Sequence, residues 1–524
     1  MSLMRLLFLF GQQCQEGGGI GCRRDGANSV IAGAFCEGFH VQCMIRVSSC
    51  ISCVFAVLAG SLGWAHKTGK EGVAEIGIPE ARYTPMARVI EQSLPAVASL
   101  QVVQAQDAPG VFTMGVGSAS VIHEEGYLLT NDHVLFRMHQ GQAFLSGRPP
   151  LPFRVIARMS SEDLAVIKVE AGEALKSLPI GRSDDLLLGE PVIIIGNPGG
   201  LAHSVSTGIV SGLNRSTAVG GSFLPRMVQT SAAVSGGNSG GPLINALGEQ
   251  IGVVTSKKLD GENINFAITV DRVREMFPTL LSAELRYGFD LGVEVDMFSP
   301  WGKVSEVEEG SPAARAGVEP DDVIVQLNGK GIRNGIDFHL ALIDRKPGDR
   351  LQMHLEREGE KVPVEVELGE LSMLEPVAEE GLKNGLRYEG FEGKWGALPD
   401  FATLEAVEKG EVELPTEEAY MTEDGENYGL RFRGFIKVPK EGLYTFYTTS
   451  DDGSRLKIGD QVVVNNDGLH SVLKRGGLVR LKEGAHPVEV TFFEQGGGEE
   501  LEVSWEGPGL PIQTVPAEAW FYRE

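Results

Sequence analysis

The chain has 524 residues, of which 42% are hydrophobic and 22% are charged, and its formal net charge at pH 7 is −25. The length predicts roughly three to four domains, and the composition is that of globular domains rather than of disordered or membrane-embedded chains. A surface this negative repels phosphate backbones, which excludes nucleic acid as an expected partner.

The cysteines all lie near the N-terminus, at Cys14, Cys22, Cys36, Cys43, Cys50 and Cys53. Neither a disulfide nor a catalytic or metal-binding thiolate is therefore expected beyond Cys53. Residues 44–65 resemble a signal peptide, because a short basic start precedes an apolar run and then small residues. A periplasmic or secreted protein is expected; alternatively, residues 47–64 would remain as a single membrane anchor.

Residues 1–43 are rich in glycine and cysteine and show no clear periodicity. We interpret them as an over-extended start, with Met44 as the true initiator. The alternative is that Leu6–Phe10 belongs to a genuine start.

Residues 87–277 alternate short β-type runs with turn signals, which predicts an all-β barrel architecture. The expected strands are Ala96–Val102, Ser120–Ile122, Tyr127–Thr130, Leu164–Val169, Pro191–Ile195, Val205–Val210, Met227–Thr230, Gln250–Thr255 and Asn265–Ile268. A helix is expected over Val270–Phe277, with Asp271 as its N-cap and Pro278 as its stop.

Residues 285–371 form a second unit in which strands and helices are mixed. Its expected strands are Leu291–Val295, Val304–Val307, Val323–Leu327, Leu351–Leu355 and Val362–Val366, and its helices are Pro312–Ala316 and Gly335–Ile343. An acidic linker near Glu375–Gly381 leads to a β-rich third unit over residues 385–524. The strands expected there are Tyr444–Thr448, Arg455–Ile458, Gln461–Val464, Pro487–Phe493 and Leu501–Trp505.

The segment Gly237–Pro242, with the sequence Gly-Asn-Ser-Gly-Gly-Pro, places Ser239 on a tight turn. Glycines allow positive φ and let N–H groups aim at one point, which an oxyanion hole requires. His133 follows an apolar strand, and Asp163 opens the run Asp-Leu-Ala-Val-Ile-Lys. A serine hydroxyl needs an adjacent base, and the base needs an orienting carboxylate. Each residue alone is more often a turn or buried residue, but the order His, Asp, Ser together predicts an acyl-transfer triad.

Over residues 87 to about 371 the chain resembles the HtrA/DegP-like trypsin-fold serine proteases. The matching segments are Gly117–Ile122, Leu129–Val134, Asp163–Val166, Ile195–Pro198 and Gly237–Pro242. The resemblance implies two six-stranded β-barrels with the site between them, and catalysis that requires no cofactor. It implies that His133 is the general base, that Asp163 orients it and that Ser239 attacks, while the N–H groups of Gly237 and Ser239 form the oxyanion hole. Unfolded or exported proteins are the implied substrates, and a homo-oligomer, usually a trimer, is the implied assembly.

Three positions depart from the family's usual pattern. Ser231 stands where aspartate is usual, Gly236 replaces a common proline or arginine, and Ala119 sits where glycine is usual. None removes a catalytic group, but the departures leave open an alternative, a non-catalytic binding protein or holdase with an idle triad. The walls expected for the specificity pocket, Ile251–Thr255 and Phe266–Ile268, hold no acidic residue and favour a small or aliphatic side chain before the cut bond.

The second unit resembles a PDZ domain. Its run Asp-Leu-Gly-Val, which includes Leu291, Gly292 and Val293, matches the loop whose N–H groups bind the carboxylate of a peptide C-terminus. The following strand would pair with the peptide by β-augmentation. The helix containing Phe338 and Leu342 would form the other wall of the groove; alternatively, these two side chains are only core.

The third unit resembles the protective-antigen-type lectin-like module, a β-sandwich. The matching stretches are Gly385–Phe391, Gly442–Ser454, Gly477, Leu481–Gly484 and His486. The resemblance implies a glycan or protein ligand and a calcium site at Asp451 and Asp452, to which Asn465, Asn466 and Asp467 would add oxygen ligands. The alternative is an Asp-Asp turn that closes two strands. The predicted fold is therefore mostly β: a trypsin-like double β-barrel, an α+β PDZ domain and a β-sandwich.

Overall fold

The structure is a computed structural model that describes residues 80–524, except 107–109, 198–203, 220–221, 258–263 and 424. The over-extended start predicted at residues 1–43 and the signal peptide or anchor predicted at residues 44–65 lie outside the described residues. Within the described part of the chain, no helix is both long and apolar enough to cross a membrane.

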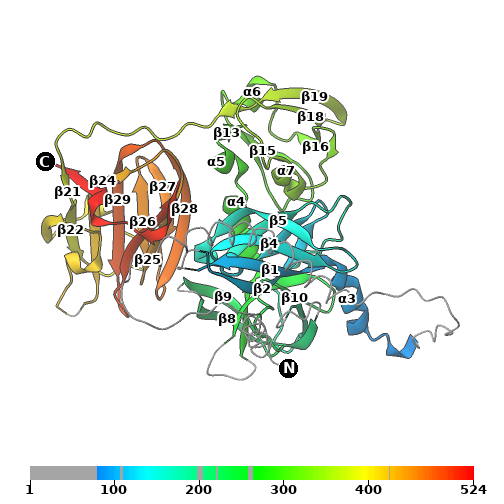
Figure 1. Cartoon of the computed structure of the whole chain (residues 1–524). Helices are drawn as coiled ribbons and strands as arrows, with labels where there is room; N and C mark the ends of the chain where they lie inside the picture. The colour runs from blue at the N-terminus through cyan, green and yellow to red at the C-terminus, as the bar shows by residue number, and fades with distance from the viewer. Residues whose placement is uncertain (1–79, 107–109, 198–203, 220–221, 258–263, 424) are drawn as a thin grey trace, which may run out of the picture. The chain divides into compact units, whose positions relative to one another are not determined.

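Two closed barrels of six strands each come first in the described chain (Figure 1). The first closes in the order β1-β2-β3-β6-β5-β4, and the second in the order β10-β11-β12-β9-β8-β7. Their strands are β1 (Val97–Ala105), β2 (Phe112–His123), β3 (Tyr127–Thr130), β4 (Met138–Leu145), β5 (Leu151–Met159), β6 (Leu164–Val169), β7 (Pro191–Gly196), β8 (Ser204–Val219), β9 (Ser222–Thr230), β10 (Pro242–Ile244), β11 (Gln250–Lys257) and β12 (Asn265–Thr269). The predicted double barrel is confirmed.

The sequence signal of each strand follows its burial. β3 and β6 are buried at every position, so both read as continuous apolar runs and both have the predicted bounds. β4 and β5 expose part of their residues and carry polar and glycine positions, and neither was among the expected strands. β4 pairs with β1 and β5 pairs with β6, and this pairing stabilises two strands whose own sequences give no clear strand pattern.

Helix α4 (Val270–Leu280) follows the second barrel and corrects two expectations. Its N-cap is Thr269, whose Oγ1 accepts from Arg272 N at 3.4 Å, and Asp271 already lies in the first turn. There the Asp271 carboxylate accepts from Ser183 N at 3.1 Å instead of capping the helix. Pro278 does not stop the helix but lies inside its last turn, where it removes one helical hydrogen bond because it has no N–H. The other helices of this part are α3 (Pro85–Ser93) and α5 (Ala283–Tyr287).

The second unit has the α+β composition that was predicted. Its sheets are β13 (Phe289–Asp290) with β20 (Gly369–Glu370), β14 (Val293–Val295) with β15 (Val304–Val307), and the order β17-β16-β18-β19 from Lys330–Gly331, Val323–Leu327, Arg350–Arg357 and Glu360–Glu367. Its helices are α6 (Pro312–Arg315) and α7 (Gly335–Ala341). β14 pairs with β15 alone among the described strands, so its other edge remains available for a ligand strand.

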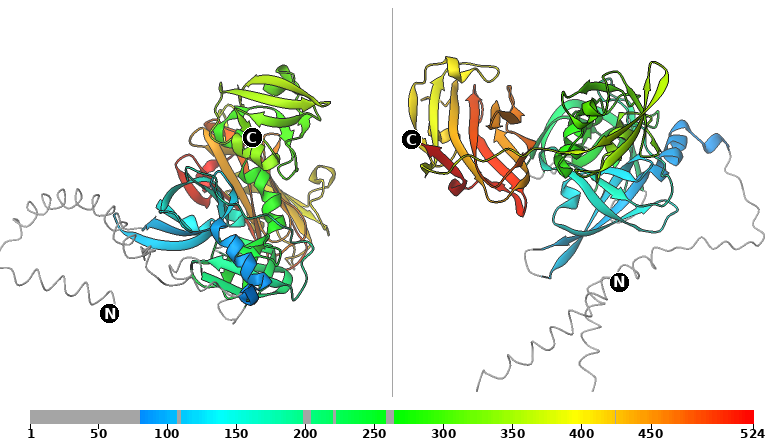
Figure 2. Two further views of the ribbon diagram at one scale, coloured as in Figure 1. Left: turned by 90° about the vertical axis from the view of Figure 1, so that its right-hand side faces the viewer. Right: turned by 90° about the horizontal axis from the view of Figure 1, so that it is seen from above.

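The third unit consists of two sheets that face each other across an aromatic core, visible as layered yellow-to-red strands in Figure 2. The larger sheet has the order β21-β32-β24-β29-β26-β27 with β22 and β23 paired beside β24, and the smaller has the order β28-β25-β30-β31. Their strands are β21 (Leu382–Asn384), β22 (Leu386–Glu392), β23 (Glu408–Val412), β24 (Tyr428–Val438), β25 (Gly442–Ser450), β26 (Ser454–Ile458), β27 (Gln461–Asn466), β28 (Leu473–Leu481), β29 (Gly484–Glu494), β30 (Leu501–Gly507), β31 (Leu510–Thr514) and β32 (Trp520–Arg523).

Candidate active site

The structure brings His133 and Asp163 together. His133 opens a short 3-10 helix just after β3, and its Nδ1 lies 2.8 and 2.9 Å from the two carboxylate oxygens of Asp163. The backbone N–H of His133 also donates to Asp163 Oδ1 at 3.0 Å. Asp163 is only 4% exposed and sits at φ +51, a left-handed conformation that aspartate tolerates, immediately before β6. The ring of His133 is therefore fixed by its own backbone and by one buried carboxylate.

Two further side chains hold Asp163 in place. Thr255 on β11 donates its hydroxyl to Asp163 Oδ2 at 2.5 Å, and Asn131 Nδ2 donates to the Asp163 carbonyl at 2.8 Å. Sequence reasoning placed Thr255 only in a pocket wall and gave Asn131 no role of its own. A threonine in an apolar strand looks like an ordinary β-former, and nothing local signals its contact with a residue so far away in the chain.

The environment changes the basicity of His133. Burial acts to lower its pKa, but the hydrogen bond and the charge of Asp163, with a further contribution from the charge of Asp132, raise the pKa above its usual value. The imidazolium form is thereby favoured next to Asp163, which is the form a general base passes through.

Ser239 lies on a double turn between β9 and β10. Asn238 N donates to Ser235 O at 3.0 Å with Gly237 at φ +105, the geometry of a type II turn. Gly241 N then donates to Asn238 O at 2.9 Å with Gly240 at φ +82. A Cβ at Gly240 would lie 2.2 Å from the Ser118 carbonyl oxygen, so glycine is required there.

The double turn is attached to the first barrel through Ser118 on β2. Ser118 N donates to Ser239 O at 2.8 Å, and Ser118 Oγ donates to Gly237 O at 2.7 Å. The N–H groups of Asn238, Gly240 and Gly241 are all hydrogen-bonded to backbone carbonyls, whereas those of Gly237 and Ser239 form no hydrogen bond with a described residue. Two unused donors beside Ser239 are what an oxyanion hole requires.

The hydroxyl of Ser239 donates to the carbonyl of Thr255 at 3.2 Å. Among the described residues, it forms no hydrogen bond with His133. The predicted triad therefore consists of two parts, Ser239 and the His133–Asp163 pair, which both contact Thr255 and are not joined by one continuous series of hydrogen bonds. The Thr255 carbonyl binds the serine and the Thr255 hydroxyl binds Asp163. Rotation about the Cα–Cβ bond of Ser239 is the only movement that its hydroxyl needs in order to leave Thr255.

The three departures from the family pattern have different surroundings. Ala119 is buried in β2, and Ser231 Oγ accepts from Ile209 N at 3.0 Å. Gly236 is exposed at the second position of the type II turn, and a Cβ built there meets no atom within 4 Å. Two of the expected pocket-wall residues, Phe266 and Ile268, are buried in the core of the second barrel and its neighbours.

The predicted peptide loop precedes β14, as the PDZ resemblance implies. Its N–H groups at Leu291 and Gly292 donate to Glu284 Oε1 at 2.8 and 3.3 Å. Phe338 and Leu342 are buried core residues, which favours the alternative interpretation that they do not line the groove. The side chain that reaches across the groove is His339, whose Nε2 donates to the Val295 carbonyl at 2.7 Å.

The predicted calcium ligands Asp451 and Asp452 accept hydrogen bonds from the backbone. Asp452 Oδ1 and Oδ2 accept from His470 N at 3.0 Å and Gln495 N at 2.9 Å, and Asp451 Oδ2 accepts from Gly498 N at 3.2 Å. In the part of the chain that the structure describes, no group of three or more His, Cys, Asp or Glu side chains is arranged to hold a metal ion. These carboxylates order the backbone of neighbouring loops, which supports the turn interpretation.

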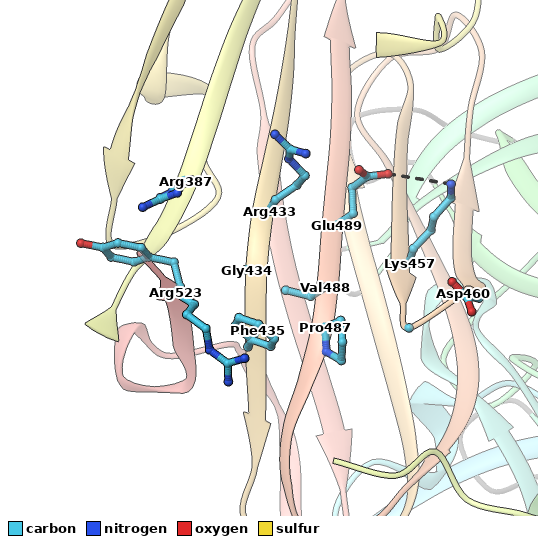
Figure 3. Close-up of a pocket in the computed structure, with 12 residues that line it drawn as sticks. Arg387, Arg433, Gly434, Phe435, Lys457, Asp460, Pro487, Val488, Glu489 and Arg523 are labelled. Atoms are coloured by element: carbon cyan, nitrogen blue, oxygen red, sulfur yellow. Dashed lines mark ion pairs between the residues drawn. The ribbon is translucent and has the colours of Figure 1, made fainter. Parts of the chain in front are cut away.

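A shallow cavity of about 620 Å³ lies on the larger sheet of the third unit (Figure 3). Neighbouring strands place Arg387 opposite Arg433, and Arg433 opposite Glu489. The Arg387 guanidinium lies 5.4 Å from the ring centroid of Tyr522. The cavity is lined by Arg387, Arg433, Gly434, Phe435, Lys457, Gly459, Asp460, Pro487, Val488, Glu489, Tyr522 and Arg523.

Three family models match the chain: a trypsin-like peptidase domain over residues 117–253, a PDZ domain over residues 289–368 and a PA14 domain over residues 408–519. They correspond in order to the three resemblances inferred from the sequence.

Relatives with known names match the first two parts. The chain is 35% identical over 272 residues to a "Probable periplasmic serine endoprotease DegP-like" of Hahella chejuensis, which covers 49% of this chain and 57% of the relative. It is 30% identical over 358 residues to the "Periplasmic pH-dependent serine endoprotease DegQ" of Escherichia coli, which covers 60% of this chain and 77% of the relative. The solved structure "HtrA-type protease AlgW with decapeptide" is 27% identical, covers 55% of this chain and 99% of its own, and has a TM-score of 0.34. The chain belongs to the HtrA/DegP family of serine endoproteases.

Proposed function

We propose that the chain is a serine endopeptidase that cleaves unfolded or exported proteins through an acyl-enzyme formed on Ser239. The observation that carries the proposal is the pairing of His133 Nδ1 with the buried carboxylate of Asp163 at 2.8 Å. This pairing keeps the proton on Nδ1 and leaves the lone pair of Nε2 to act as a general base.

In the proposed mechanism the Ser239 hydroxyl turns from the Thr255 carbonyl toward His133. Nε2 takes the hydroxyl proton while Oγ forms a bond to the substrate carbonyl carbon, and the resulting oxyanion accepts from the N–H groups of Gly237 and Ser239. The imidazolium then gives the proton to the leaving nitrogen as the C–N bond breaks. Water repeats the sequence on the acyl-enzyme and releases the second product.

The test is cleavage of denatured casein by the purified chain and by Ser239→Ala. We expect the substitution to lower kcat by at least about 10³-fold. Ser235→Ala is the matched control, because Ser235 lies on the same turn, is exposed and takes part through its backbone carbonyl. Unchanged cleavage by Ser239→Ala would show that the assignment is wrong.

The alternative is a non-catalytic binding protein with an idle triad. It is favoured by one observation, the hydrogen bond of the Ser239 hydroxyl to Thr255 rather than to His133. An activity-based fluorophosphonate probe separates the two proposals, because it reacts only with a serine that has an operating base. Labelling of Ser239 would exclude the idle triad.

A periplasmic or secreted location and a homo-oligomer complete the proposal. The location is supported by the relatives from Hahella chejuensis and Escherichia coli, which are named as periplasmic endoproteases. The oligomer is supported by family resemblance, and light scattering coupled to size-exclusion chromatography is expected to give the mass of a trimer. A monomer mass at micromolar concentration would contradict it.

We also propose that the third unit binds an acidic glycan on the face shown in Figure 3. Arg387 and Arg433 are directly opposite on neighbouring strands, and Arg433 also pairs with Glu389 at 3.1 Å. Like charges directly opposite each other cost stability, and an anion bound between the two arginines would lower that cost. Guanidinium groups bind carboxylates and sulfates in a bidentate manner, and the nearby rings of Tyr522 and Phe435 offer faces to a sugar ring. In this account, metal plays no part in the binding.

The test is titration of the chain with oligogalacturonate, with a neutral dextran oligomer as the reference ligand. The double substitution Arg387→Gln and Arg433→Gln is expected to weaken binding at least tenfold. Lys437→Gln, on β24 like Arg433, is expected to leave the affinity unchanged. EDTA is expected to have no effect. Equal binding of dextran, or unaltered binding by the double variant, would contradict the assignment of this face.

A further inference from the structure

The carboxylate-binding loop of the PDZ domain already holds a carboxylate from its own chain. Glu284, on the short helix α5, accepts from Leu291 N at 2.8 Å and from Gly292 N at 3.3 Å through one oxygen. These are two of the three N–H groups, those of Leu291, Gly292 and Val293, that the sequence assigned to a peptide C-terminus. A free terminal carboxylate would therefore have to compete with an internal one.

The loop cannot turn to offer a second set of donors. The Leu291 carbonyl accepts from Ala313 N at 3.0 Å, and the Gly292 carbonyl accepts from Glu308 N at 3.0 Å. Gly292 has φ +73, and a Cβ built on it would lie 2.1 Å from the Ser311 Cβ, so the loop is packed tightly against α6. A trans peptide places the Gly292 N–H opposite the Leu291 carbonyl, so the hydrogen bond of that carbonyl keeps the Gly292 N–H directed toward Glu284.

The charges around the loop also oppose a second carboxylate. Burial raises the pKa of Glu284, and the charges of Asp290 and Glu308 raise it further, while the N–H groups of Leu291 and Gly292 act in the opposite direction. None of these three carboxylates forms an ion pair with a described residue. An incoming terminal carboxylate would add a fourth negative charge to a site where none of these three carboxylates is paired with a cation among the described residues.

The rest of the groove can bind a ligand strand whether or not the strand ends in a free carboxylate. The free edge of β14 presents the Val295 carbonyl, which now accepts from His339 Nε2 at 2.7 Å. An extended ligand strand would replace this hydrogen bond with one from its own backbone N–H, as β-augmentation requires. That exchange is the same for an internal segment and for a chain end.

We propose that this PDZ groove selects internal extended segments of unfolded chains and discriminates against free C-terminal carboxylates, with Glu284 as the specificity-determining residue. Glu284 satisfies the loop's donors in place of a ligand carboxylate, and the ligand contributes only a strand to β14. The inference deepens the proposed function, because it rests on peptide recruitment by this domain and names the class of peptide recruited.

The experiment uses the full chain with Ser239→Ala, so that the ligand is not cut. One apolar decapeptide is made as a C-terminal amide and as a free acid, each with a fluorophore at its N-terminus, and binding is followed by fluorescence polarisation. We expect the amide to bind at least fivefold more tightly than the acid. The amide mimics an internal segment because its end carries no charge.

Two substitutions separate the charge of Glu284 from its occupation of the loop. Glu284→Gln removes the charge but keeps an accepting oxygen, and is expected to bring the two affinities within twofold of each other. Glu284→Ala frees the N–H groups, and is expected to make the acid the tighter ligand. Glu356→Gln, on an exposed position of β18, is the matched control and should retain the preference for the amide.

Tighter binding of the free acid by the unsubstituted groove, with no change in Glu284→Ala, would overturn the inference. Binding of neither peptide by any variant would overturn it together with peptide recruitment by the PDZ domain. The protease assignment is tested separately, by casein cleavage with the chain in which Ser239 is intact. Loss of peptide preference with normal casein cleavage would therefore contradict only the inference about the groove. Equal melting temperatures of the variants confirm that they are folded.

Discussion

Thr255 is the residue on which the two halves of the candidate site meet. Its hydroxyl donates to Asp163 and its carbonyl accepts from Ser239, so one residue of β11 contacts both the predicted orienting carboxylate and the predicted nucleophile. The sequence predicted His133, Asp163 and Ser239 because their flanking residues carry strong local patterns. It could not assign Thr255, because β11 belongs to the second barrel and Asp163 to the first, and only packing of one barrel against the other brings the two residues into contact.

Removal of the Thr255 hydroxyl is expected to reduce catalysis without abolishing it. Thr255→Val keeps the shape of the side chain but leaves one Asp163 oxygen without its donor, so His133 is oriented less well. We predict a loss of about tenfold in kcat with little change in KM. Thr255→Ser, which restores a hydroxyl, should recover most of the activity; equal loss in both variants would contradict this role.

The raised pKa of His133 predicts the pH dependence of cleavage. Only the neutral imidazole accepts the serine proton, so kcat/KM should rise with pH and level off above the folded-state pKa. Because Asp163 and Asp132 raise that pKa, the midpoint should lie above 6.5. Casein cleavage measured from pH 5 to 9 checks this, and a midpoint at or below 6.5 would be inconsistent with the charged surroundings of His133.

At the scale of elements, the type II turn from Ser235 to Asn238 decides where the oxyanion donors point. A type II turn needs positive φ at its third residue and accepts proline at its second. Gly237 supplies the first requirement with φ +105, whereas Gly236 leaves the second position unconstrained. The sequence singled out Gly236 as a departure, and the structure shows that the position is sterically open.

Gly236→Pro is therefore expected to stabilise the active turn. Proline removes freedom from the unfolded chain, which is worth about 0.4–1 kcal/mol at a compatible position. The variant should melt slightly higher and keep or increase its rate of casein cleavage. Gly237→Ala is the opposite case, because alanine is strained at φ +105, and it should lose most activity. An inactive Gly236→Pro would show that the turn must open during catalysis.

Elements were predictable from the sequence where their buried residues form a clear apolar pattern. β3, β6, β15 and β16 have the bounds that the sequence predicted, because their apolar runs begin and end at turn residues. β4 and β5 were missed because their stability comes from partners rather than from their own residues. The side chain facing the peptide groove was also missed, since helical periodicity marks Phe338 as apolar but does not say that His339 is the residue that reaches β14.

At the scale of the whole molecule, the third unit carries a pH-sensitive group that the sequence did not suggest. Glu494 ends β29 with 1% of its surface exposed, and Gly496 N donates to its Oε1 at 2.6 Å. Its Oε2 has no hydrogen-bond partner among the described residues. Burial and the charges of Asp452 and Asp451 raise the pKa of Glu494 to about 8.

This shift predicts lower stability in alkaline solution. The folded state binds the Glu494 proton more tightly than the unfolded state, whose pKa is 4.5, so the free energy of unfolding falls as pH rises from 4.5 through 8. Between pH 5.5 and pH 8.5 the loss is on the order of 3 kcal/mol. Calorimetry should show that the melting temperature of the parent chain is lower at pH 8.5 than at pH 5.5. The melting temperature of Glu494→Gln should be the same at both pH values. A transition that moves equally in both would assign the effect elsewhere.

Ser239 is proposed to be an operating nucleophile in this member of a serine endoprotease family. The most direct measurement is mass spectrometry of the chain after treatment with a fluorophosphonate probe. We predict a single adduct on Ser239, a marked loss of labelling in His133→Ala, and full labelling in Ser235→Ala. An unlabelled Ser239 in a folded chain, or labelling that persists without His133, would contradict the account.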